Sequence, residues 1–129
     1  MTDATGGCLC GAVRFTATGP PTRVGLCLCL ECRKHHGAMF YAAAVFPADR
    51  FSRTGDTRAY KGRAFCPVCG SSVYAESVGE VEVHLGALDD PNAFTPSYEL
   101  WTCRRAPWMP RFEGVQSFET DRTNAGKLD

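Results

Sequence analysis

Cys66-Pro67-Val68-Cys69-Gly70 is the stretch that decides the fold, because two thiols separated by two residues can grip one tetrahedral metal ion. Pro67 fixes φ where the chain turns between the thiols, and Gly70 can adopt a positive φ where the chain leaves. Such a turn supplies two ligands, so a second pair must come from elsewhere. Cys8 and Cys10 are the candidates, since side chains two apart on an extended strand face the same side. Together the two pairs predict a closed four-cysteine zinc site.

A second cluster, Cys27-Leu28-Cys29-Leu30-Glu31-Cys32, places three more thiols within one turn of chain. Three protein ligands on a zinc ion leave a fourth position for water or an incoming thiol. A metal held in this way lowers the pKa of a bound thiol or water and polarises a carbonyl group. The spacing therefore predicts an open, catalytic zinc site at Cys27, Cys29 and Cys32. Its thiolates are oxidisable, so oxidation or incomplete zinc occupancy is expected there.

Cys103, the eighth cysteine, leaves other interpretations open. If it completes the second site, the chain is a two-zinc structural or protein-interaction module without catalysis. A third interpretation is a thiol redox protein in which the cysteines of the second cluster cycle through a disulfide. Structural disulfides fit the spacings poorly, because residues in C-x-C are too close to crosslink without strain. Iron–sulfur ligation is disfavoured because the runs match neither ferredoxin spacing.

The size and charge of the chain narrow its class and its partners. Its 129 residues predict one zinc-binding domain, with a core at about residues 6–114 and a mobile tail at 121–129. The formal net charge is zero, which gives no electrostatic reason to expect nucleic acid or a membrane surface as partner. Neither a secretory signal nor a membrane-spanning run is visible, so a cytoplasmic location is expected. The partner is then a small-molecule thiol or aldehyde, and the protein a monomer or small homo-oligomer.

Short segments with alternating character predict a mainly β fold of antiparallel sheets in a sandwich-like layout. Residues 12–17 and 81–85 alternate, and in the second of these Glu82 and His84 are expected to face solvent. Residues 39–46 are apolar on both faces, as suits a central strand covered on two sides. Residues 58–65 and 72–76 flank the Cys66–Cys69 turn and are expected to pair across it.

One short helix is predicted, at residues 30–36. Its last turn carries four basic side chains, where positive charge is favoured, and Gly37 supplies the stop. His35 and His36 are therefore interpreted as helix-end charges rather than as proton carriers for the open site. From Leu100 onward the periodicity weakens, and irregular chain packed over the sheet is expected.

Three stretches together resemble one family: Gly7-Cys8-Leu9-Cys10-Gly11, Cys27-x-Cys29-x-x-Cys32-Arg33-Lys34 and Phe65-Cys66-x-x-Cys69-Gly70. This is the glutathione-dependent formaldehyde-activating enzyme family, which includes the centromere protein V domain. The resemblance implies a β-tent fold with two zinc ions, a structural ion on the first cysteine set and a catalytic ion on the second. It also implies addition of glutathione to formaldehyde, giving S-hydroxymethylglutathione, with glutathione as co-substrate. The expected activity is that of a zinc-dependent carbon–sulfur lyase-like enzyme acting on such an adduct or on a similar small electrophile.

Leu28 and Leu30 depart from the family pattern, in which His is usual at the first position and Ser frequent at the second. Polar groups around a metal orient and tune its ligands, so the departure bears on the chemistry more than on metal binding. The candidate residues for the two carboxylates of glutathione are Arg33 and Lys34, with Arg104 and Arg105 further along the chain, because Arg matches carboxylate geometry well.

Overall fold

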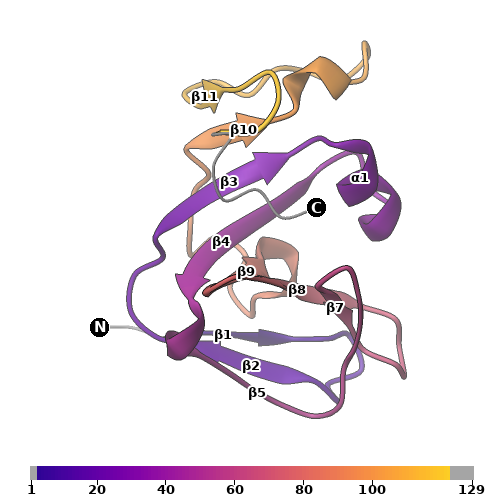
Figure 1. The fold of residues 1–129 in the computed structure, drawn as a ribbon, viewed down its shortest axis with the longest axis vertical. Helices are drawn as coiled ribbons and strands as arrows, with labels where there is room; N and C mark the ends of the chain where they lie inside the picture. Colours follow the sequence, from indigo (N-terminus) through magenta and orange to yellow (C-terminus); the bar gives the residue numbers. More distant parts are fainter. Residues whose placement is uncertain (1–2, 123–129) are drawn as a thin grey trace.

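The computed structural model describes residues 3–122, which form two β-sheets (Figure 1). The small sheet is antiparallel, with β1 (Ala4–Gly7), β2 (Arg14–Ala17) and β5 (Phe51–Thr54) side by side in that order. The large sheet has eight strands. In spatial order they are β11 (Gln116–Ser117), β10 (Tyr98–Leu100), β3 (Arg23–Cys27), β4 (Tyr41–Pro47), β9 (Glu80–His84), β8 (Ser72–Ser77), β7 (Arg63–Phe65) and β6 (Arg58–Tyr60).

One face of the large sheet packs on the small sheet and forms the core. Ala44 and Phe46 of β4 are fully buried, and Val83 opposite them on β9 is buried with them. Phe15 and Ala17 of β2 close the core from the small sheet. Burying a Val or Phe side chain contributes about 1.5–3 kcal/mol, so this apolar face holds the two sheets together. The expectation of a central strand at 39–46 is confirmed, since β4 lies between β3 and β9.

The opposite face of the large sheet is also covered, and here one sequence-based expectation is wrong. The helix α1 (Leu30–His36) lies beside the ends of β3 and β4 (Figure 1), and its His36 ring contacts His84 and Tyr41 on this face. His84, which was expected to face solvent, is only 5% exposed. Glu82 on the same face is partly buried rather than solvated. Alternation separates the two faces of a strand, but it does not reveal whether the polar face meets water or a second layer.

The helix α1 begins and ends as the sequence predicts. Cys29 is its N-cap, and the Cys29 Sγ accepts a hydrogen bond from the Cys32 backbone N–H at 3.3 Å. Gly37 adopts φ 65° at the C-terminal end, where its N–H donates to the Arg33 carbonyl at 2.8 Å. A left-handed glycine is the usual helix stop, so the termini of α1 are set locally. Three short 3-10 turns complete the elements: η1 (Ala48–Arg50), η2 (Leu85–Ala87) and η3 (Thr102–Arg104).

The segment expected as one strand at 58–65 forms two. Lys61 and Gly62 have φ values of 49° and 78°, which reverse the chain between β6 and β7. Two consecutive residues with positive φ make the tight turn that suits an antiparallel hairpin. β7 then pairs antiparallel with β8 across the Cys66–Cys69 turn, as predicted.

Before Leu100 the chain adds a strand to the large sheet, and after Leu100 it is mostly irregular, as expected, apart from η3 and the two-residue β11 at the sheet edge. β10 pairs parallel with β3, and β11 pairs parallel with β10. The Glu99 carboxylate, 1% exposed, binds the Arg105 guanidinium and accepts a hydrogen bond from the Ser117 hydroxyl at 2.6 Å. The Asp121 carboxylate accepts from Trp101 Nε1 at 3.0 Å, so the predicted tail begins in ordered chain. Residues 123–129 of that tail lie outside the described residues.

The predicted fold class is confirmed: the chain is mainly β, and α1 is the one α-helix in residues 3–122. The departure from a purely antiparallel arrangement lies in β10 and β11. No helix in the described part of the chain has the length and apolar character needed to cross a bilayer.

Candidate metal centres and cleft

Cys8, Cys10, Cys66 and Cys69 come together as one group, with their sulfurs all within 4.8 Å of one another. The Cys8 and Cys10 sulfurs are 3.6 Å apart, and those of Cys10 and Cys66 are 3.8 Å apart. A tetrahedral zinc ion with Zn–S bonds of about 2.3 Å requires sulfurs separated by roughly 3.8 Å. A disulfide requires about 2.05 Å, so these thiols are spaced for a metal and not for a crosslink.

Hydrogen-bond donors lie around the first group and outweigh burial to lower the pKa of Cys8, whereas the neighbouring thiols, Cys8 first, raise the pKa of Cys10 to about 11. The Val13 N–H donates to the Cys8 Sγ at 3.2 Å, and the Val68 N–H donates to the Cys66 Sγ at 3.4 Å. The Ser71 hydroxyl lies 3.1 Å from the Cys69 sulfur and lowers the pKa of that thiol to about 5. Hydrogen bonds to an ionised form stabilise it, and metal binding requires deprotonated thiols.

Cys27, Cys29 and Cys32 form the second group, also with sulfurs within 4.8 Å of one another. They lie where β3 ends and α1 begins, so all three come from one short segment. Hydrogen bonds from Cys27 and Cys32 hold the pKa of Cys29 well below its ordinary value, while the same contact with Cys29 raises that of Cys27. Three converging thiols that share protons are the donor set of a three-coordinate metal site.

Cys103 lies apart from the second group. It is exposed on η3 and is not part of either set of converging sulfurs. The two-zinc module with a closed second site needs Cys103 as its fourth ligand. Within residues 3–122, the second group therefore offers three cysteine sulfurs to a metal ion.

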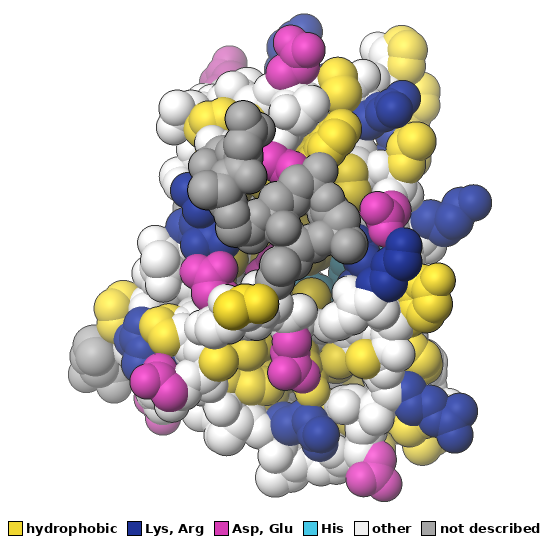
Figure 2. All heavy atoms as spheres, in the orientation of Figure 1, with side chains coloured by type: hydrophobic (Ala, Val, Ile, Leu, Met, Phe, Trp, Pro, Cys, Tyr) yellow, Lys and Arg dark blue, Asp and Glu magenta, His cyan; other side chains and the backbone are white. Residues whose placement is uncertain are grey.

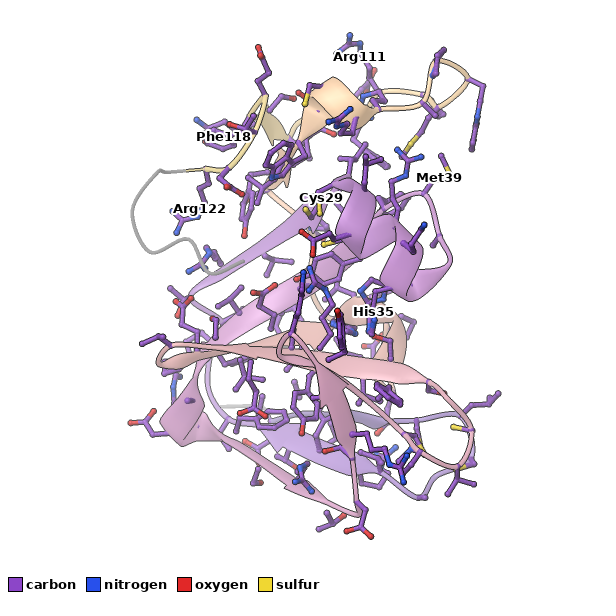
Figure 3. The ribbon with its side chains drawn as sticks, turned by 45° about the vertical axis from the view of Figure 1, so that its right-hand side comes forward. Cys29, His35, Met39, Arg111, Phe118 and Arg122 are labelled. Atoms are coloured by element: carbon purple, nitrogen blue, oxygen red, sulfur yellow. The ribbon has the colours of Figure 1, made fainter. Side chains whose placement is uncertain are left out.

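The second group opens onto a cleft of about 520 Å³ on the covered face of the large sheet. Figure 2 shows this face with a recessed histidine in a hollow, and Figure 3 shows Cys29 at the start of α1 with His35 toward the end of the helix. Register explains which residues line the cleft: Gly25 and Cys27 of β3 pair with Ala43 and Tyr41 of β4 and so share a face with them. Ligand pockets for small molecules are usually about 300–1,000 Å³, so the cleft is large enough for a tripeptide.

Basic side chains at the mouth of the cleft come from the β6–β7 hairpin and the C-terminal segment. Lys61 Nζ and Arg63 Nη1 lie 3.5 Å and 4.0 Å from the same oxygen of Glu31. Arg104 and Arg122 line the opposite part of the cleft. These contacts are loose, so the cations remain available to a second anion.

Arg33 and Lys34, the candidates for glutathione contacts, lie on α1 but are not among the residues that line the cleft. The Arg33 guanidinium donates to the Arg104 carbonyl at 2.7 Å and thereby ties α1 to η3. His35 Nε2 lies 3.0 Å from the Ser72 hydroxyl, which in turn lies 3.2 Å from His84 Nδ1.

The interpretation of His36 as a helix-end charge does not hold. Burial, with the charges of His35 and Arg63, lowers the pKa of His36 to about 4, so its ring is neutral at pH 7. His36 instead stacks on Tyr41, with ring centroids 4.7 Å apart and an interplanar angle of 11°. It follows Cys32 by one helical turn and so lies on the same side of α1 as that ligand.

Tyr41, Glu82 and His84 form a polar wall in the cleft that the sequence did not indicate as functional. Tyr41 belongs to an apolar run, and Glu82 and His84 occupy the polar positions of an alternating strand. The sequence signal that could have identified Glu82 and His84 is that two titratable side chains alternate with apolar residues along one strand. Their meeting depends on the pairing of β4 with β9, which the sequence did not establish.

The fold and the thiol groups define a mainly β protein with two cysteine clusters that could each hold a metal ion, one of four sulfurs and one of three. Residues 3–104 match the sequence profile of the family described as "Glutathione-dependent formaldehyde-activating enzyme". The match spans most of the chain, and the chain belongs to this family.

A solved crystal structure of a Rhodobacter sphaeroides protein has a similar fold. The two chains superpose with a TM-score of 0.53 at 22% sequence identity, covering 71% of this chain and 91% of the other. At this identity the likeness concerns the fold alone. No curated protein matches the sequence.

Proposed function

We propose that this protein is a zinc-dependent carbon–sulfur lyase-type enzyme that forms or breaks the adduct of glutathione with formaldehyde or with a similar small electrophile. The observation that supports it best is the open group Cys27, Cys29 and Cys32 on the wall of a cleft sized for a tripeptide. Membership of the glutathione-dependent formaldehyde-activating family supports the substrate class.

Both thiol groups fit zinc by chemistry and spacing. Cys8, Cys10, Cys66 and Cys69 would hold a structural ion, and Cys27, Cys29 and Cys32 would hold a second ion at the cleft. When bound at the second site, zinc supplies a Lewis acid that favours a thiolate and polarises a carbonyl. The chain's part is to bring the three sulfurs together, to favour the ionised form of Cys29, to orient the substrate and to exclude water.

The cleft offers charges that match glutathione, which carries two carboxylates and one ammonium group. Lys61 and Arg63 on the β6–β7 hairpin, with Arg104 and Arg122 on the other side, would receive the carboxylates. Arg33 and Lys34 lie outside the cleft lining, so the carboxylates would instead contact the cations that face the cavity. The peptide then spans the cleft with its thiol toward Cys29.

The proposed setting is a reducing compartment, because free thiols are needed at both sites. The two-zinc module without catalysis loses its main support, since Cys103 lies outside the second group.

Glutathione titration of the cobalt-substituted protein tests the proposal. We expect glutathione to change the sulfur–cobalt absorption of one of two sites, and S-methylglutathione, which keeps the carboxylates but has no free thiol, to leave it unchanged. Cys29→Ser should abolish the response, whereas Cys103→Ser should keep it. No change with glutathione in the wild-type protein, or an equal change with both peptides, would contradict the proposal.

A further inference from the structure

Tyr41 stands beside the open thiol group and is held on all sides. It is the register partner of Cys27, and both side chains line the cleft. Directly cross-strand side chains on one face have Cβ atoms about 4.5–5.5 Å apart, so the Tyr41 ring begins next to a ligand of the site. The next residue on the same face of β4 is Ala43, whose methyl group leaves room for the ring to lie along the strand.

Three contacts fix the Tyr41 ring. His36 stacks on one face at 4.7 Å, and His84 meets the ring edge-on at 5.1 Å with an interplanar angle of 87°. The phenol hydroxyl contacts the Glu82 carboxylate. Burial lowers the pKa of His84 to about 3, and His36 is also neutral at pH 7, so neither ring competes for a proton.

Glu82 is a carboxyl group with an unusual environment. Burial raises its pKa, the Arg23 charge opposes that shift, and the Cys29 charge reinforces it. Arg23 is itself committed to Glu80 through two hydrogen bonds of 2.9 Å. A carboxylate that is more basic than an exposed one accepts a proton more readily near neutral pH. Titratable and charged groups also facing this part of the cleft from the packed elements are His36, Arg63, Glu80, His84 and Tyr98.

We propose that Tyr41, with Glu82 behind it, is the proton-transfer group of the open site and acts on the oxygen of the substrate adduct. This inference rests on the proposed function. In breakdown, the Tyr41 oxygen accepts the hydroxyl proton of the hydroxymethyl thioether while the phenol proton passes to Glu82. The oxygen electrons form the carbonyl bond, the carbon–sulfur bond breaks, and its electron pair leaves on the thiolate. Formaldehyde and thiolate are released, and the Glu82 proton returns to the thiolate or to solvent, which completes the balance.

Packing alone does not account for this pair. A partly buried carboxyl group facing a phenol loses part of its hydration, and apolar residues of the same size would fill the space at lower cost. Perturbed carboxyl groups in clefts are concentrated at functional sites. The opposite face of β9 carries Val81 and Val83, which fill the core with apolar side chains.

The test compares Tyr41→Phe and Glu82→Gln with wild-type protein, and Tyr74→Phe is the matched control. Tyr74 is also a buried tyrosine, but its hydroxyl lies toward Thr57 and it is not part of the cleft lining. Both test substitutions preserve side-chain size. Readouts are glutathione affinity by cobalt absorption and enzyme-catalysed exchange between formaldehyde and S-hydroxymethylglutathione, measured by NMR exchange spectroscopy with the uncatalysed rate subtracted.

We expect both variants to bind glutathione within about twofold of wild type and to lose about 10²-fold or more of the exchange rate, together with its solvent deuterium isotope effect. The Tyr74→Phe protein should match wild type in all three measurements. A Tyr41→Phe protein with wild-type exchange and isotope effect would overturn the inference while leaving the proposed function intact. A wild-type protein that neither responds to glutathione nor catalyses exchange would overturn both.

Discussion

Protonation of buried His84 should make the fold sensitive to moderate acid. His84 is 5% exposed, and burial, followed by the His36 charge, lowers its pKa from 6.5 to about 3. In the unfolded chain the imidazole takes up a proton near its ordinary pKa, whereas the folded chain resists it. The unfolded state therefore binds more protons between these two values, and stability falls as the pH drops through this window.

The magnitude follows from the width of that window. Each pH unit between the unfolded and folded pKa values changes the free energy of unfolding by about 1.4 kcal/mol for one group. Lowering the pH from about 6.5 to about 5 should thus remove about 2 kcal/mol through His84 alone. Metal release and His36 also respond to acid, so the His84 contribution must be isolated by comparison.

The comparison uses a His84→Leu variant, which retains the size of the side chain and removes its titration. Urea unfolding followed by tryptophan fluorescence at about pH 7 and about pH 5 gives the loss of stability in each protein. We expect wild type to lose about 2 kcal/mol more than His84→Leu over this range, because contributions common to both cancel. Equal losses in the two proteins would refute a neutral, buried His84.

Three further comparisons of variants test the metal sites and the packing. Cys66→Ser should lower the zinc content and destabilise the whole fold in thermal unfolding. Cys29→Ser should remove the second metal and leave the melting temperature within a few degrees. Equal destabilisation by the two changes would count against the division into structural and open sites. Gly55→Ala should reduce the free energy of unfolding in urea by about 2 kcal/mol or more, because its Cβ would lie 1.9 Å from the Ala12 carbonyl oxygen. The control Gly79→Ala is also at positive φ but has open space around it, and it should cost about 1 kcal/mol. Similar losses in the two variants would contradict a steric clash at Gly55. Arg105→Met should cost about 3–5 kcal/mol because it leaves Glu99 buried without its cation, and Glu99→Gln combined with it should restore part of that loss; additive losses would contradict this pairing.

Local features were predictable from the sequence. The C-x-C and C-x-x-C spacings identified the cysteines that face one another within each short run, because this depends on the geometry of two or three neighbouring residues. The joining of Cys8 and Cys10 to Cys66 and Cys69 followed from the four ligands that a closed zinc site requires. The helix at 30–36 was predicted for the same reason, since its N-cap and its glycine stop lie within the segment itself. The Lys61-Gly62 turn is also a local feature, but the apolar alternation of residues 58–65 predicted one continuous strand across it.

Features that depend on distant pairing were not predictable. The burial of His84 requires His36 of α1 and Tyr41 of β4 to pack on a face that alternation assigns to solvent. The β10 strand joins β3 in parallel across more than seventy residues, for example Tyr98 opposite Gly25. The contact of Tyr41 with Glu82 arises only once β4 and β9 are adjacent. Periodicity carries no information on which strands become neighbours.

The two thiol groups differ in which parts of the chain they connect, and this difference suits the first group to a structural role and the second to a catalytic role. The first group joins Cys8 and Cys10 to Cys66 and Cys69, so a metal there closes a loop across much of the chain and restricts the unfolded state. The second group draws Cys27, Cys29 and Cys32 from one short segment, so a metal there closes almost no loop. The strand β3 and the helix α1 are already positioned by sheet pairing and by the cap at Cys29. A metal at the second site would therefore not be needed to hold the fold, and under the proposed function its three cysteines would meet a substrate in the cleft.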